Sequence, residues 1–194
     1  MNIKISGIGW YMSATYELRR DHEVIMQVLN AMDTLRMLLR QGKDVPLEVI
    51  YDTIDFAKNF TDRCHHGKEE DVLFPALNAA GMPKDEGPIA VMLREHRQGR
   101  EILAKIEDAL TRHKQGSSSL DGVIAGIEEY IMLMQHHIFK ENNILFNIAD
   151  MLLSSKSNEL NKGYERVEHE VMHDKHGHYK EMVESIVERI DAMK

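Results

Sequence analysis

Two related stretches decide how this chain folds: CHHGKEEDVLFPAL, residues 64–77, and HHIFKENNILFNIA, residues 136–149. Placed 72 residues apart, they align five identical residues of the first stretch with five of the second: His65 with His137, Lys68 with Lys140, Glu69 with Glu141, Leu73 with Leu145 and Phe74 with Phe146. An internal repeat of this kind indicates a fold built from two similar halves.

A weaker repeat precedes each of these stretches. LRRDHEVIMQVL at 18–29 aligns with MLREHRQGREIL at 92–103, which pairs His22 with His96 and Asp21 with Glu95. Each half therefore holds one histidine in its first segment and His-x-x-x-Glu in its second. We expect two helical hairpins related by a pseudo-twofold axis.

The spacing of apolar residues predicts four long helices, at about 13–41, 46–80, 89–114 and 123–153, separated by glycine and proline. Alternating runs typical of strands are lacking. The predicted fold is all-α: an up-and-down antiparallel four-helix bundle with an additional C-terminal helical segment. We expect a lead at 1–12, the bundle at 13–153, and an extension at 154–194 that packs on the bundle and is interrupted near Gly177.

Composition narrows the class of protein. The 194 residues include 24 Lys and Arg and 32 Asp and Glu, which gives a net charge of −8. This negative charge argues against nucleic-acid binding. Cys64 is the single cysteine, so an intramolecular disulfide is excluded and a cytoplasmic location is expected. The apolar runs are far shorter than the roughly 20 residues of a membrane span. Eleven histidines remain to be explained.

The helical period separates inward from outward histidines. At about 100° per residue, His65 lies in line with Ile54, and Glu69 follows one turn later on the same face. His66 and Glu70 are turned by about a further 100°, toward polar residues. We therefore expect His65 and Glu69 in the core, and His66 and Glu70 at the surface.

The same reasoning applies to the other three helices. His137 and Glu141 fall on the apolar face of the fourth helix, and His136 falls outside it. His22 and His96 lie in line with apolar neighbours on the first and third helices. Each helix thus contributes one inward histidine.

Such a core is costly unless it binds metal, because buried imidazoles and carboxylates must be paired or ligated. Six residues form the candidate ligand set: His22, His65, Glu69, His96, His137 and Glu141. Six ligands exceed one tetrahedral zinc site and suit two ions bridged by carboxylates. Imidazole and carboxylate without thiolate favour iron, with manganese as an alternative. We interpret Cys64 as a small core residue.

The chain resembles the hemerythrin-like, HHE cation-binding family through four motifs in order: DHEVI from Asp21, CHHGKEEDVLFPAL from Cys64, EHRQGR from Glu95 and HIFKENNILF from His137. The resemblance covers about residues 13–153. It implies a four-helix bundle around a non-haem di-iron centre with the six ligands above. It also implies that both glutamates, with an oxo or hydroxo group, bridge the irons.

One feature departs from the family pattern. Oxygen-carrying and iron–sulfur repair members use five histidines, and no further histidine follows His22 on the first helix. Possible extra ligands are His66, if its helix is rotated, and residues of the C-terminal tract: His169, Glu170, His173 and His176. The alternative for that tract is a solvated polar helix covering the end of the bundle.

The resemblance implies a protein that binds or responds to dioxygen, nitric oxide or peroxide. An enzyme, an iron–sulfur cluster repair or stress-protection factor working with a redox partner, and an iron storage or delivery protein are the alternatives. A metal-free interaction protein is a further class. Histidine-rich ligation favours reversible binding over the chemistry of ferritin-like oxidases, whose sites are richer in carboxylates.

Overall fold

The computed structural model describes residues 13–117, 119–172 and 176–194, and of residues 172, 176–178 and 180 it describes the backbone alone. The bundle has four long helical rods. The first is α1 (Tyr16–Arg40), and the second is the continuous run of α2 (Leu47–Phe56), η1 (Ala57–His66), η2 (Glu69–Leu73) and α3 (Phe74–Ala79). The third is α4 (Gly87–Lys114), and the fourth is the run of α5 (Asp121–Lys140), η3 (Glu141–Leu145) and α6 (Phe146–Leu152). A short 3₁₀ turn, η4 (Ser154–Lys156), leads to α7 (Ser157–Met172) and α8 (His176–Asp191).

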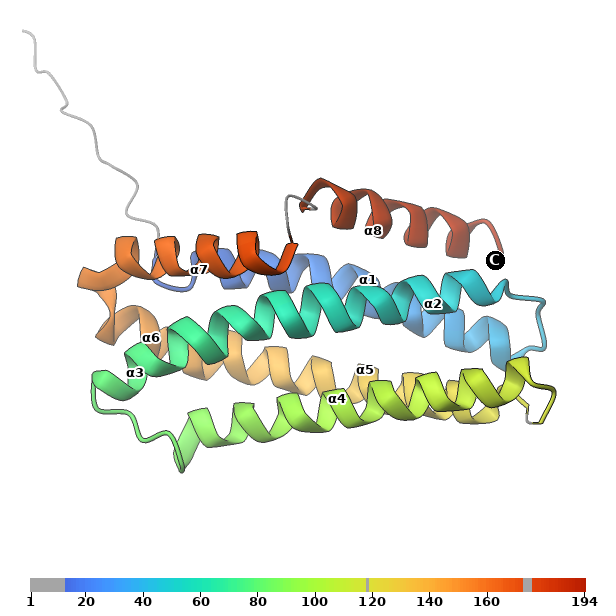
Figure 1. Ribbon diagram of the computed structural model, residues 1–194, viewed down its shortest axis with the longest axis horizontal. Helices are drawn as coiled ribbons and strands as arrows, with labels where there is room; N and C mark the ends of the chain where they lie inside the picture. Colours follow the sequence, from blue (N-terminus) through green and yellow to red (C-terminus); the bar gives the residue numbers. More distant parts are fainter. Residues whose placement is uncertain (1–12, 118, 173–175) are drawn as a thin grey trace, which may run out of the picture.

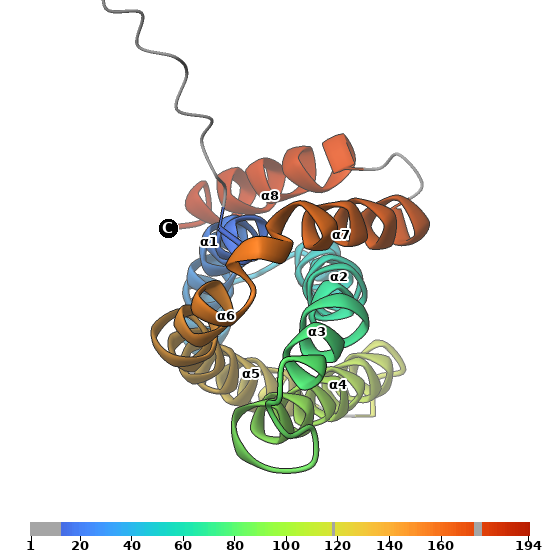
Figure 2. The same ribbon diagram turned by 90° about the vertical axis from the view of Figure 1, so that its left-hand side faces the viewer.

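The rods run up and down around a common core, which confirms the predicted antiparallel four-helix bundle (Figures 1 and 2). α5 packs against α1 and α4, and η1 packs against α4. No strand occurs in the part of the chain that the structure describes. The turns after α1 and α3 use glycines with positive φ, Gly42 at 70° and Gly81 at 100°, a conformation that side chains with a Cβ resist.

The C-terminal helices lie along one side of the bundle, next to α1 and the second rod (Figure 2). α8 contacts α1 and α2, whereas α7 contacts η1 and η2. Apolar side chains spaced along α8, Val183, Ile186 and Ile190, are buried in this contact. α7 therefore covers the segment of the bundle that carries His65, His66 and Glu69.

The apolar core is divided into two clusters. The larger one includes Ile25, Cys64 and Ile138, and the smaller one includes Leu18, Leu73 and Leu145. On each rod, residues of the two clusters flank a short polar stretch; on α1 that stretch holds His22. The candidate site thus lies between two apolar layers that keep bulk water away from it.

Candidate metal centre

Seven polar side chains meet between these layers, and each is 3% exposed or less. They come from all four rods: His22 of α1, His65 and His66 of η1, Glu69 of η2, His96 of α4, His137 of α5 and Glu141 of η3. We call them the His/Glu cluster. The structure brings together all six residues selected from the helical faces and adds His66.

The expectation that His66 faces solvent is wrong, because its helix is not a regular α-helix. η1 is π-helical, with i→i+5 hydrogen bonds that widen the turn and bring consecutive residues closer to one face. His65 and His66 both point inward, and the His66 ring stacks on His96 with centroids 3.8 Å apart. The rotated helix considered as an alternative is the arrangement found.

The other π-helical segments move the buried face by one residue. A regular α-helix would place Ile144, seven residues after His137, on the same face as that histidine. Ile144 is instead 50% exposed, whereas Leu145 is 1% exposed. In the matching half, Val72 is half-buried and Leu73 is fully buried. The π turns η2 and η3 each begin at a cluster glutamate, so both glutamates keep the inward position that the sequence predicts.

Ligand atoms of the cluster form two groups, each within 4.8 Å: His66, Glu69, His96 and His137 in one, and His22, His65, Glu69 and Glu141 in the other. Glu69 belongs to both. Its Oε2 lies 3.3 Å from His96 Nε2, and its Oε1 lies 3.7 Å from His65 Nε2.

Glu141 also reaches both groups, since its Oε2 lies 3.2 Å from His22 Nε2 and 3.3 Å from His137 Nε2. Two atoms bound to one ion at about 2.1 Å, at angles of about 90–109°, lie about 3.0–3.4 Å apart. Most of these spacings therefore fit shared ligation of an ion.

The outward nitrogen, Nδ1, of each cluster histidine donates a hydrogen bond. The five acceptors, which we call the outer partners, are Asn142 for His22 (2.9 Å), Asp21 for His65 (3.3 Å), Asp62 for His66 (3.3 Å), Glu70 for His96 (2.7 Å) and Glu95 for His137 (3.1 Å). With the proton on Nδ1, each Nε2 presents a lone pair to the centre.

Sequence reasoning missed these outer partners, although the repeat contained the signal. Asp21 and Glu95, which directly precede His22 and His96, occupy matching places and accept from His65 and His137. Asp62 has a different role, because it accepts from His66, the histidine that the other half of the repeat lacks.

Cations stabilise the outer carboxylates. Although burial raises the pKa of Asp21, the hydrogen bond from His65 and the charge of Lys68 outweigh it and hold that pKa below its ordinary value. Burial likewise raises the pKa of Glu70, but hydrogen bonds from His96 and Arg100 outweigh burial and hold that pKa below its ordinary value. Asp21 and Glu70 therefore remain carboxylates, which can only accept from the imidazoles.

Inside the cluster, burial lowers the pKa of His65 and of His96 to about 4, and burial together with the nearby charge of Glu141 raises the pKa of Glu69. Neutral imidazoles are the form that binds a metal ion.

The cluster contains nearly all the unpartnered polar atoms of the described interior. Ten buried side-chain nitrogen or oxygen atoms there lack a hydrogen-bond partner; nine are the five Nε2 atoms and the four glutamate oxygens of the cluster, and the tenth is Asn161 Oδ1. These imidazole nitrogens and carboxylate oxygens are buried without hydrogen bonds, which is unfavourable without a cation. The donor set therefore fits bound metal.

Other predicted positions lie away from the cluster. His169 and Glu170 are exposed on α7, and His136 is exposed on α5. His173 and the side chain of His176 are outside the described residues. Cys64 is buried in the apolar core, and burial raises the pKa of its thiol to about 12, which agrees with a core residue.

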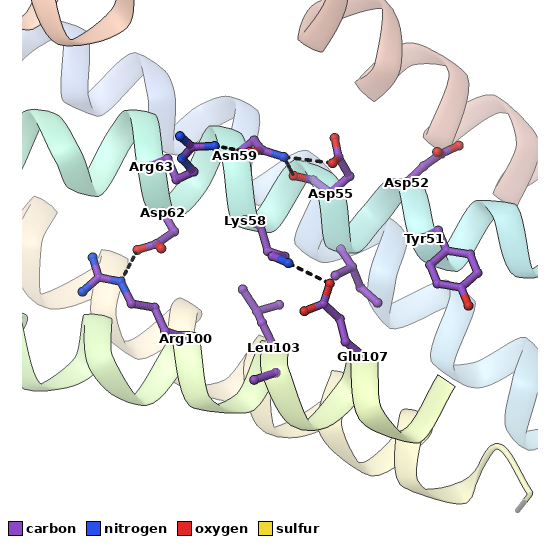
Figure 3. Close-up of a pocket in the computed structure, with 12 residues that line it drawn as sticks. Tyr51, Asp52, Asp55, Lys58, Asn59, Asp62, Arg63, Arg100, Leu103 and Glu107 are labelled. Atoms are coloured by element: carbon purple, nitrogen blue, oxygen red, sulfur yellow. Dashed lines mark hydrogen bonds and ion pairs between the residues drawn. The ribbon is translucent and has the colours of Figure 1, made fainter. Parts of the chain in front are cut away.

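Two surface hollows approach the cluster. A groove of about 720 Å³ runs between the second rod and α4, where Arg100 pairs with Asp62 and Lys58 pairs with Glu107 (Figure 3). A second cleft, of about 630 Å³, lies between α1 and η3 and is lined by His22 and Asn142. The ion pair of Asp62 with Arg100 lines the first hollow, whereas the neutral Asn142 lines the second.

Comparison with known proteins finds relatives described as iron–sulfur cluster repair proteins. The protein YtfE of Musicola paradisiaca is 38% identical over 85 residues, 42% of this chain and 38% of the relative. A probable iron–sulfur cluster repair protein of Haemophilus influenzae is 28% identical over 131 residues, 66% of this chain and 57% of the relative. The chain thus covers less than two thirds of the length of each of these relatives. No solved structure gives a significant match.

No helix in the described residues has the length and apolar character needed to cross a membrane. The hemerythrin HHE cation-binding domain matches residues 13–149, most of the chain and all four rods. The chain therefore belongs to the hemerythrin HHE cation-binding domain family.

Proposed function

We propose that the His/Glu cluster holds two iron ions. His66, His96 and His137 would bind one ion, His22 and His65 would bind the other, and Glu69 and Glu141 would be shared. The nine unpartnered buried atoms carry this proposal, because they converge from four rods on one small volume. Imidazole and carboxylate ligation without thiolate favours iron, with manganese as the competing ion.

Iron in this donor set would supply redox chemistry and an open position for dioxygen, nitric oxide or peroxide. The chain's own residues prepare that position: the outer partners orient each imidazole, and the apolar clusters on both sides exclude water. The two groups differ by one histidine, since Ile138 occupies the place that matches His66. An open position would therefore fall to the ion that His22 and His65 would hold, and His22 also lines the cleft between α1 and η3.

We further propose that the centre serves protection or repair of iron–sulfur clusters during oxidative or nitrosative stress. The relatives described as iron–sulfur cluster repair proteins support this role, and so does the burial of the His/Glu cluster, which excludes large substrates. Reversible binding of a diatomic ligand is the second candidate, favoured by the histidine-rich donor set.

Two experiments test the proposal. Elemental analysis of protein purified without added metal should give two irons per chain, and zero or one would overturn the two-ion centre. Iron-loaded protein should then reactivate an iron–sulfur enzyme damaged by nitric oxide, and Glu69→Ala and His137→Ala should abolish this. Equal reactivation by those variants would exclude the cluster as the working part.

Reversible binding gives a different result. A charge-transfer absorption band should appear when ferrous protein meets dioxygen and disappear when dioxygen is removed. Irreversible bleaching with iron release would argue against this candidate. Reactivation without a reversible band would favour repair.

A further inference from the structure

α7 packs directly on η1 and η2, the segments that carry His65, His66 and Glu69 of the His/Glu cluster. A Cβ added to Gly163 would lie 2.7 Å from Val72 Cγ1, so only glycine permits this approach. One turn further along α7, Val167 Cγ1 lies 3.4 Å from the position of a Cβ on Gly67, which is between His66 and Lys68 in the sequence. The contact leaves little freedom between α7 and the second rod.

A line of three charged side chains, Glu168, Lys68 and Asp21, connects α7 to His65 of the cluster. Glu168 Oε2 lies 2.7 Å from Lys68 Nζ, and Lys68 Nζ lies 3.0 Å from Asp21 Oδ2. The same Asp21 oxygen accepts from His65 Nδ1 at 3.3 Å. The Lys68 side chain is 2% exposed and that of Asp21 is 9% exposed, whereas that of Glu168 is 28% exposed. Water therefore screens the inner part of this line poorly, between Lys68 and Asp21.

The other half of the repeat shows what α7 changes. There Lys140 pairs with Glu95, which accepts from His137, but the side chain of Lys140 is 33% exposed. Water solvates the charge of Lys140, whereas Lys68 depends on carboxylates for its neutralisation. Asp21 also uses one oxygen for both of its donors, whereas Glu95 uses a separate oxygen for each. The lysine and the imidazole therefore compete for Asp21.

We infer that Glu168 is a positioning residue for the metal position of His22 and His65, through which the C-terminal extension sets the affinity of that position. Glu168 shares the charge of Lys68, so that Asp21 remains a good acceptor for His65 Nδ1 and keeps Nε2 a strong donor to metal. With Glu168, Lys68 and Asp21 all charged, this line also carries one net negative charge beside the divalent cation that His22 and His65 would bind. The inference rests on the proposed two-ion centre, and the extension acts without providing a ligand.

The test is Glu168→Gln, which removes the charge and keeps the shape. Glu165→Gln is the matched control, because Glu165 is an exposed glutamate on the same helix. Ferrous ion is titrated anaerobically into metal-free protein in competition with a coloured chelator. Loss of an outer partner costs roughly 10–100-fold in metal affinity, and Glu168 stands two contacts beyond the outer partner Asp21, with Lys68 between them. We expect one of the two ions to bind about threefold to tenfold more weakly, and the control to match wild type.

A purely structural role for Glu168 would move stability without distinguishing the two ions. Mössbauer spectra of the iron-loaded variant should therefore change for one iron and not for the other, and Glu168→Asp should restore most of the affinity. Wild-type binding of both ions by Glu168→Gln would overturn the inference and leave the two-ion centre standing. Wild-type protein that binds no iron would overturn both.

Discussion

Replacing His66 by isoleucine should affect the metal-free and metal-loaded protein in opposite directions. Isoleucine is the residue at the matching place of the other half, Ile138, so the change makes the two halves alike. If His66 is a ligand, its buried Nε2 is a cost that metal offsets. If it is an ordinary core histidine, its removal should cost stability in both forms.

The contacts of His66 determine the expected change in the stability of the metal-free protein. Removing an unsatisfied buried Nε2 relieves about 1–3 kcal/mol, and losing the hydrogen bond to Asp62 costs about 0.5–1.5 kcal/mol. Asp62 keeps its pairing with Arg100, 2.8 Å away. Burial of isoleucine adds an apolar gain of about 1.5–3 kcal/mol, part of which the lost stacking on His96 cancels. We expect a net stabilisation of about 1–3 kcal/mol.

Thermal unfolding followed by circular dichroism measures this gain, at about 2–4 °C per kcal/mol for a chain of this size. Anaerobic titration with ferrous ion should show one of the two ions weakened by at least the roughly 10–100-fold that an outer partner costs. His136→Ile, the same change at the exposed neighbour of His137, is the control. A less stable metal-free His66→Ile protein, or unchanged binding of both ions, would refute the reasoning.

Three further predictions address the centre and its support. Glu141→Gln, which keeps the shape but halves the shared negative charge, should lower iron content from two to one or none per chain by elemental analysis; two retained irons would contradict its bridging place. Gly163→Val should clash with Val72 and lower the melting temperature by several degrees, and an unchanged value would show that α7 can shift freely. Because burial lowers the pKa of His65 and His96 to about 4, the unfolded chain binds more protons below about 6.5. The raised pKa of Glu69 acts in the opposite direction, but the lowered pKa values of three histidines, His65, His66 and His96, outweigh it. Urea titrations of metal-free protein should therefore show stability that falls as the pH decreases from about 6.5 toward 4; a rise in stability over that range would contradict the burial of neutral imidazoles.

The sequence by itself determined the bundle and most of the centre. Helical periodicity, the glycine-marked turns and the internal repeat predicted four antiparallel rods, and the structure confirms them. They also selected the histidines and glutamates that meet in the core, because a polar residue aligned with buried apolar neighbours one turn away must itself be buried.

Only the tertiary structure decided the place of His66 and the role of the extension. The period of an α-helix turns His66 outward, and the π-helical turn that brings it inward gives no signal in apolar spacing, because it arises where four rods converge on one cluster. The C-terminal tract seemed to offer histidines as ligands. Its contribution among the described residues is instead Glu168, which reaches the centre through Lys68 and Asp21. The first of these contacts joins residues 100 positions apart in the sequence and the second joins residues 47 positions apart. Side-chain periodicity assigns a residue to a face of its own helix, but packing decides which charge on another helix faces it.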